Sequence, residues 1–257
     1  MPLLVTDALV LHSANYLESS RIFRLATREA GMQSVVARSA RTSKKRFGSA
    51  VGLFALGQAQ IDQRPGRDLH TLTGFDVVNA QSALAEDLGR FSAASAIAEC
   101  ALRVVHDESA PLVYEGLRDS LRALGIASGQ ETVAVGLGAL WRLVRDVGFA
   151  PTLDVCAECD AQINKDEPVA FDHVAGGVLC QRCAYRAIGA RTLPASARDA
   201  IRAWMDGESV ELNHGEARAH QRLMREFVSQ HLTDGRPLRA FADWERDGLG
   251  AASGQMP

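Results

Sequence analysis

Two Cys-x-x-Cys pairs constrain this chain more than any other feature of its sequence. They are Cys156-Ala-Glu-Cys159 and Cys180-Gln-Arg-Cys183, with 20 residues between the inner cysteines. Pairs at this separation can bring four thiolates into a tetrahedron around Zn²⁺, and two matched pairs favour metal over a redox-active pair of thioredoxin type. We expect one structural Zn²⁺, because four Cys fill its shell. His173, which lies between the pairs, is then expected to be solvent-exposed.

Two short strands are predicted between the cysteine pairs, at 168–172 and 176–179, as in a zinc ribbon. We therefore assign 151–189 to a zinc-binding module. The fifth cysteine, Cys100, stands in an apolar stretch with Ala96, Ile97 and Leu102. We interpret it as a small buried core residue rather than a reactive thiol.

The first 80 residues predict five short strands, at 4–12, 20–27, 32–37, 57–63 and 69–79. Asn15-Tyr16 and Arg64-Pro-Gly-Arg67 are turn signals between them. Five strands is the count of an OB-type β-barrel, whose face and loops commonly bind single-stranded nucleic acid. A small SH3-like barrel fits nearly as well on strand count alone.

A basic stretch with no acid interrupts the predicted barrel between positions 38 and 46. The Ser, Ala and Thr residues between its basic side chains are too small and polar to form a core, so we expect the stretch to be a surface loop. Its positive charge could contact nucleic-acid phosphates. The alternative is a solvated surface loop without a binding role. Phe47 follows and is expected to fill the barrel rather than stack on a base. The predicted phosphate contacts are Arg38, Arg41, Lys44, Lys45 and Arg46. Weaker candidates, for which ordinary solubilising charge is the alternative, are Arg21, Arg24, Arg64 and Arg67.

The charge of the chain is unevenly distributed. Its net charge is −3, but residues 1–80 hold ten Lys and Arg against six Asp and Glu, leaving 18 against 25 in the remainder. The N-terminal part therefore carries +4 and the rest −7, so a polyanion is expected to bind at the N-terminal end. No signal peptide and no apolar run of about 18 residues is present, which predicts a cytoplasmic protein without membrane contact.

A helical pattern begins at residue 82. Helices are predicted at 82–106, 111–125, 131–147, 196–206 and 216–232, with a last helical turn at 238–244. The predicted class is α+β, with an OB-fold DNA-binding domain at 1–80, a helical domain at 81–150 and 190–247 and a disordered tail at 248–257. No phosphate-binding loop, dinucleotide motif, nucleophile elbow or zinc-protease motif occurs, so no enzyme is expected.

The combined pattern resembles the RecO family of bacterial recombination mediators. The N-terminal sequence carries most of the resemblance. The segments that resemble the family are residues 8–12, 16–21, 27–31, the basic stretch ending Arg46-Phe47-Gly48, and 66–73. The helical middle and the four cysteines extend it over nearly the whole chain. This sequence departs from the family in its basic loop, which is interrupted by Ser and Thr rather than containing Pro.

The resemblance implies an OB-fold, a helical domain and a zinc module. It implies binding of single- and double-stranded DNA, annealing of complementary strands, and loading of recombinase onto coated single strands. It also implies partnership with RecR and with the acidic C-terminal tail of single-stranded-DNA-binding protein. A groove carrying Arg118, Arg122 or Arg142 beside apolar residues is a physical candidate for that tail. The alternatives are a zinc-ribbon nucleic-acid-binding factor in transcription or RNA metabolism, and a nucleic-acid-modifying enzyme.

Overall fold

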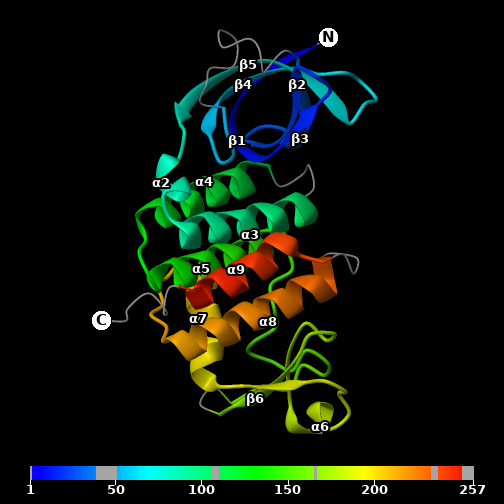
Figure 1. Cartoon of the computed structure of the whole chain (residues 1–257). Helices are drawn as coiled ribbons and strands as arrows, with labels where there is room; N and C mark the ends of the chain where they lie inside the picture. The colour runs from blue at the N-terminus through cyan, green and yellow to red at the C-terminus, as the bar shows by residue number, and fades with distance from the viewer. Residues whose placement is uncertain (1, 39–50, 106–109, 165–166, 233–236, 251–257) are drawn as a thin grey trace, which may run out of the picture. The chain divides into compact units, whose positions relative to one another are not determined.

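The computed structural model describes residues 2–38, 51–105, 110–164, 167–232 and 237–250 (Figure 1). The chain divides into two compact units, residues 1–126 and 127–257. The first holds a β-barrel followed by helices, and the second holds helices and a small sheet. This confirms the predicted α+β class, with a barrel at the N-terminus and a four-cysteine cluster among the later helices.

A closed barrel forms the N-terminal part of the first unit (Figure 1). Its strand order is β1-β2-β3-β5-β4, with β4 pairing back onto β1. The β3–β5 pair is parallel and the others are antiparallel. The strands are β1 (Leu3–Tyr16), β2 (Ser20–Thr27), β3 (Gly31–Ala37), β4 (Leu56–Asp62) and β5 (Leu69–Asn79).

The first strand, β1, is longer than predicted because it pairs with two neighbouring strands. Leu3–Leu9 pairs with β4, and Ala8–Tyr16 pairs with β2, with a bulge between Val10 and His12. The turn predicted at Asn15-Tyr16 is therefore wrong, since both residues lie in the ladder. The turn falls two residues later, where Leu17 adopts a positive φ of 53°.

Alternating side chains fill the barrel. In β3, for example, Val35 and Ala37 are fully buried whereas Val36 between them is half-buried, as the period of two requires. Gly57 marks a close approach of two strands, because a Cβ there would lie 2.3 Å from the Asp76 carbonyl oxygen. The core cluster comprises Ala8, Val10, Phe23, Leu25, Val35, Ala37, Val51, Ala55, Ala59, Ile61, Leu72 and Phe75.

Three helices complete the first unit: α2 (Ser82–Ala85), α3 (Leu88–Val104) and α4 (Ala110–Ile126). The α3 helix buries a row of alanines, which lets neighbouring elements pack closely, and Phe54 from the barrel meets Phe91 of α3 edge to face at 5.8 Å. Cys100 is 1% exposed within α3, and burial raises the pKa of its thiol. It is thus an inert core residue, as predicted.

The second unit is built on α5 (Glu131–Asp146), α7 (Ala195–Asp206), α8 (His214–Leu232) and α9 (Arg239–Gly250). Trp141 of α5 packs against Phe227 of α8, with ring centroids 5.4 Å apart. The α9 helix extends well beyond the single helical turn predicted there. It overlaps the start of the predicted tail, whose residues 251–257 lie outside the described part of the chain.

A three-stranded antiparallel sheet with the order β7-β6-β8 accompanies these helices. Two of its strands, β6 (Val169–Asp172) and β7 (Gly177–Leu179), lie where the sequence predicted them. The third, β8 (Arg191–Leu193), was not predicted, because three residues carry no readable period. A short helix, α6 (Gln181–Ala184), follows β7. Among the described residues, no helix is both long and apolar enough to cross a membrane.

Candidate metal centre and nucleic-acid interface

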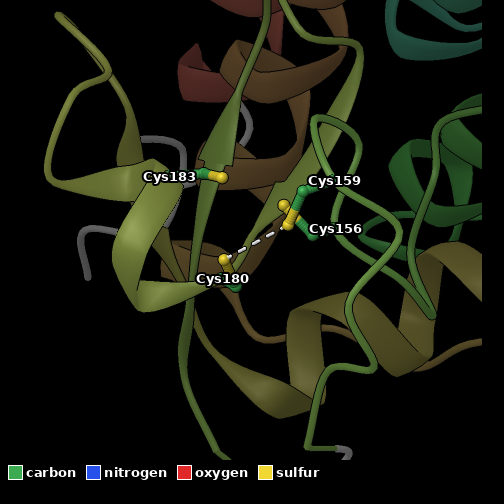
Figure 2. Close-up of side chains that lie close together, drawn as sticks. All are labelled: Cys156, Cys159, Cys180 and Cys183. Carbon is green, nitrogen blue, oxygen red and sulfur yellow. Dashed lines mark hydrogen bonds between the residues drawn. The ribbon is translucent and has the colours of Figure 1, made fainter.

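The four paired cysteines come together in the second unit. Their sulfur atoms all lie within 4.8 Å of one another, and Figure 2 shows the side chains converging from two separate segments. The Sγ atoms of Cys159 and Cys180 are 3.7 Å apart. A tetrahedron of thiolates around Zn²⁺ at about 2.3 Å has edges of about 3.8 Å, so the donor set fits such an ion.

The first pair lies in a tight turn closed by its own backbone. The Cys156 N–H donates to the Ala161 carbonyl at 2.8 Å, and the Asp160 N–H donates to the Cys156 carbonyl at 2.9 Å. Asp160 adopts a positive φ of 57°, which short polar side chains tolerate best after glycine. This turn points both sulfur atoms of the pair in one direction.

The second pair follows β7 directly. Cys180 precedes α6, and its carbonyl accepts the Ala184 N–H at 2.9 Å. Backbone hydrogen bonds join β7 to the segment before the first pair, with the Val178 N–H donating to the Thr152 carbonyl at 2.9 Å. Gly177 permits this approach, because a Cβ there would lie 2.4 Å from the same carbonyl oxygen. The Ala157 N–H donates to the Val178 carbonyl at 2.8 Å, which joins the two halves of the cluster.

The thiols of the cluster differ in acidity. Burial of Cys156 opposes its ionisation, but backbone N–H groups of Cys180, Glu158 and Cys159 outweigh burial and lower its pKa to about 6. Burial and hydrogen bonds with neighbouring sulfurs raise the pKa of Cys183 to about 12. A bound divalent cation would favour the thiolate form of all four groups.

Three arginines make hydrogen bonds or charge contacts with the cysteine cluster or with the segments next to it. Arg182 lies beside the sulfurs of Cys159 and Cys183, whose hydrogen bonds and charge raise its pKa. Arg198 of α7 is fully buried and donates to the Asn164 carbonyl at 2.8 Å. Arg202 of α7 donates to the Leu153 carbonyl at 3.1 Å and to the Asp154 carboxylate at 2.8 Å. These contacts could not be predicted from the sequence, because their partners are backbone atoms or lie about 50 positions away.

The expectation that His173 is solvent-exposed is wrong. Its side chain is 13% exposed, and its Nε2 lies 3.2 Å from the Glu226 carboxylate. Burial lowers its pKa, although Glu226 acts in the opposite direction. Glu226 also pairs with Arg191 at 3.0 Å, so α8 covers this side of the ribbon. No further cluster of possible metal ligands occurs within the described ranges.

The candidate nucleic-acid interface lies on the barrel. Of the basic stretch, only Arg38 is described, and its side chain is exposed at the end of β3. The other predicted contacts of this stretch, Arg41, Lys44, Lys45 and Arg46, and also Phe47, lie outside the described residues.

Arg21 lies beside both ends of that stretch. Its backbone pairs with Ala37, the residue before Arg38, and its Nη1 donates to the Val51 carbonyl at 3.4 Å. Its guanidinium also lies 5.2 Å from the centre of the Phe23 ring. Arg21 thus marks the barrel end from which the basic stretch departs and to which it returns.

Arg24 lies on the opposite face of β2, turned out of the barrel. In the neighbouring strands it stands between His12 of β1 and Ser34 of β3, and Ser34 in turn pairs with Leu69 at the start of β5. Leu69 follows the β4–β5 hairpin, which carries Arg64 and Arg67. These three arginines therefore share one side of the barrel, and the β2–β3 face is the one that OB-type barrels commonly use for oligonucleotides.

The arginines of the barrel fall into two electrostatic groups. Arg28 lies between the carboxylates of Asp7, at 3.7 Å, and Glu115, at 3.6 Å, and against the ring of Tyr114. Within the described ranges, the predicted contacts make no ion pair with a carboxylate; they are Arg21, Arg24, Arg38, Arg64 and Arg67. Among the described residues their positive charge has no carboxylate partner, so it is available to attract an anionic backbone.

An OB-type barrel joined to a helical part and a four-cysteine cluster defines a class of modular barrel proteins, and comparison with known proteins places the chain within it. The family described as Recombination protein O N terminal matches residues 1–81. The family described as Recombination protein O C terminal matches residues 85–240. The two matches adjoin and together span most of the chain.

Individual relatives agree with the family matches. The DNA repair protein RecO of Anaeromyxobacter sp. (strain K) is 37% identical over 246 residues, which cover 91% of this chain and 93% of that protein. The DNA repair protein RecO of Myxococcus xanthus is 32% identical over 247 residues, covering 95% and 97%. The chain therefore belongs to the RecO family of DNA repair proteins.

Proposed function

We propose that this chain is a non-catalytic mediator of DNA repair and recombination in the cytoplasm. In this role it binds single- and double-stranded DNA, anneals complementary strands, and helps to load recombinase onto coated single strands. The observation that carries the proposal is the group of arginines on the barrel without carboxylate partners among the described residues, in a chain of the RecO family.

Annealing requires contacts that hold a strand without choosing its sequence. Contacts from arginine to phosphate have this property, because phosphates carry no base information. They also leave the base edges free to pair with a second strand. The exposed Arg38 and Arg67 and the outward-facing Arg24 suit this role. We propose that Arg41, Lys44, Lys45 and Arg46, which lie outside the described residues, add to the same contact.

We infer that the four cysteines hold one structural Zn²⁺. Cys156, Cys159, Cys180 and Cys183 would supply four thiolates, which fill a tetrahedral shell and leave no position for a substrate. The ion would bring the charge that lets the fourth thiol ionise. Through Arg198 and Arg202 the cluster is braced against α7, so its loss would weaken the second unit beyond the module itself.

We propose RecR and the acidic tail of single-stranded-DNA-binding protein as partners. The tail offers negative charge and a terminal Phe, so its site must combine a cation with an apolar hollow. Arg118 and Arg122 lie on α4 and Arg142 on α5. Arg118 is already paired with Asp119 at 2.8 Å, whereas Arg122 is exposed and pairs with no described carboxylate. Arg122 is therefore the favoured candidate.

An annealing assay tests the proposed function. Complementary oligonucleotides, each coated with single-stranded-DNA-binding protein, are mixed with the full chain and duplex formation is followed. Faster annealing without cleavage or modification of either strand supports the proposal. Preference for RNA would point to a factor in transcription or RNA metabolism, and a chemically altered strand would point to an enzyme.

A further inference from the structure

A cavity of about 340 Å³ lies within the second unit, between β8, α7, α8 and the connecting residues 210–212. This volume falls within the range of pockets that hold small ligands or anchoring side chains. Neither the cysteine cluster nor the arginines of the barrel line it. Its apolar wall comprises Leu193, Pro194, Ala197, Ala200, Val210, Leu212, Ala219 and Leu223.

One buried polar side chain lines this cavity. His220 of α8 is 4% exposed, and its ring meets that of Trp204 edge to face at 4.9 Å. Its Nδ1 is buried without a hydrogen-bond partner in the described part of the chain, whereas Nε2 keeps accessible surface. Burial lowers its pKa to about 4, so the ring is neutral at physiological pH. Because Nε2 keeps accessible surface, a ligand in the cavity can reach it, and covering this atom without a hydrogen-bond partner would be unfavourable.

The charged groups lie at the rim of the cavity. Glu226 is engaged by Arg191 and His173, and Glu216 accepts the Asn213 backbone N–H at 2.8 Å. Glu211 and Arg222 are exposed and pair with no described side chain of opposite charge. Three carboxylates against two guanidinium groups make the rim slightly negative, which disfavours phosphates and acidic peptides.

Thr192 and Ser196 also line the cavity and are exposed, so they belong to its rim. An apolar interior with one buried polar side chain and a polar, charged rim is the pattern of a pocket for a single anchoring residue. A free small molecule is usually held by several convergent polar groups, which this interior lacks. The residue must bring its own hydrogen-bonding group to His220. A phenolic hydroxyl both donates and accepts, so it can bond to the His220 Nε2 in either tautomer, whereas Phe or Leu would cover Nε2 without bonding to it.

We propose that this cavity receives a tyrosine side chain of a partner protein, with the hydroxyl bonded to His220 and basic flanking residues facing the rim. The ligand chemistry differs from that of an acidic, Phe-ended tail. The site is therefore independent of the interaction proposed above for single-stranded-DNA-binding protein.

The test titrates the full chain with three capped tripeptides, acetyl-Lys-Tyr-Lys-amide, acetyl-Lys-Phe-Lys-amide and acetyl-Asp-Tyr-Asp-amide, by saturation-transfer NMR. The Lys-flanked Tyr peptide is expected to bind about fivefold more tightly than its Phe counterpart, the contribution of one hydrogen bond. The Asp-flanked peptide should bind more weakly than the Lys-flanked one. Equal affinity for Tyr and Phe, no saturable binding of the Tyr peptide, or tighter binding of the acidic peptide overturns the proposal.

Two variants locate the binding. Ala197→Leu adds bulk to the cavity wall from a half-buried position and should abolish binding of the Lys-flanked Tyr peptide. His220→Phe should retain binding but lose the preference for Tyr over Phe. Circular dichroism and thermal melting confirm that both variants fold. If folded Ala197→Leu binds the peptide as well as the parent chain does, the cavity is not the site and the proposal fails.

Discussion

The Sγ atoms of Cys159 and Cys180 lie 3.7 Å apart although the two residues are 21 positions apart in the chain. One belongs to a tight turn before the ribbon sheet, and the other follows the last residue of β7. Their separation is close to the edge of a tetrahedron of thiolates around a metal ion. On the proposal that the four cysteines hold a structural ion, a local structure of such short strands and turns would depend on this centre for its stability.

Replacing one ligand should release the metal. Cys156→Ser and Cys180→Ser are each expected to lose most of one Zn²⁺ per chain and to lower the melting temperature. Structural zinc sites contribute on the order of 10 kcal/mol of apparent binding free energy. Elemental analysis and thermal unfolding measure both effects.

Cys100→Ala provides the matched control, because it removes one thiol from α3 and leaves the cluster intact. This variant should keep its zinc. Carefully purified parent chain without metal, and with Cys156 and Cys159 joined in a disulfide, would instead favour a redox role for the pair.

Arg24 and Arg28 form a second matched comparison. Arg24 lies within β2 and Arg28 directly follows that strand, four positions later. Arg24→Ala should reduce the slope of log affinity against log salt for single-stranded DNA by about 0.7, the value of one phosphate contact. Arg28→Ala should leave that slope unchanged and lower stability by about 0.5–1 kcal/mol, because Arg28 is paired with Asp7 and Glu115. The reverse pattern would show that the assignment of uncompensated charge is wrong.

The buried His220 predicts a pH dependence of stability. Its pKa is lowered from 6.5 to about 4 in the folded chain, so between these values the unfolded state binds more protons. Its contribution is complete above pH 6.5 and is lost as the pH falls towards 4, amounting to on the order of 3 kcal/mol. Denaturant unfolding of the parent chain and of His220→Gln, from neutral pH downwards, isolates this contribution. Identical pH profiles for the two proteins would refute it.

The acidic tail of single-stranded-DNA-binding protein should bind the full chain through Arg122. A labelled tail peptide is expected to show saturable binding at low salt, weakened several-fold by Arg122→Ala and by removal of the peptide's terminal Phe. Fluorescence anisotropy measures all three. Arg118→Ala serves as the comparison, since its guanidinium is already bonded to Asp119. Absence of saturable binding would remove this partner.

The sequence predicted those parts of the fold that depend on local patterns. Alternating runs indicated the five strands of the barrel, and the spacing of Cys156, Cys159, Cys180 and Cys183 indicated one centre. It missed β8, because Arg191–Leu193 forms a strand only by pairing with β6. It also placed the first turn of the barrel too early, because closure of the barrel extends β1 along two neighbours.

Burial and charge pairing were harder to predict because distant residues set them. His173 reads as an exposed residue in a polar turn, yet Glu226 of α8 covers it from 53 positions away. Arg24 and Arg28 are indistinguishable in the sequence, and only the positions of Asp7 and Glu115 separate them. The cavity at His220 likewise depends on how β8, α7 and α8 pack together.

The salt dependence of single-stranded DNA binding tests the central claim most directly. The fourfold variant Arg41→Ala, Lys44→Ala, Lys45→Ala and Arg46→Ala is compared with the parent chain on an oligonucleotide of mixed sequence. If about three of these cations contact phosphate at once, the slope of log affinity against log salt should flatten by about 2, and affinity at low salt should fall tenfold or more with the melting temperature unchanged. An unchanged slope and an unchanged affinity would contradict the account.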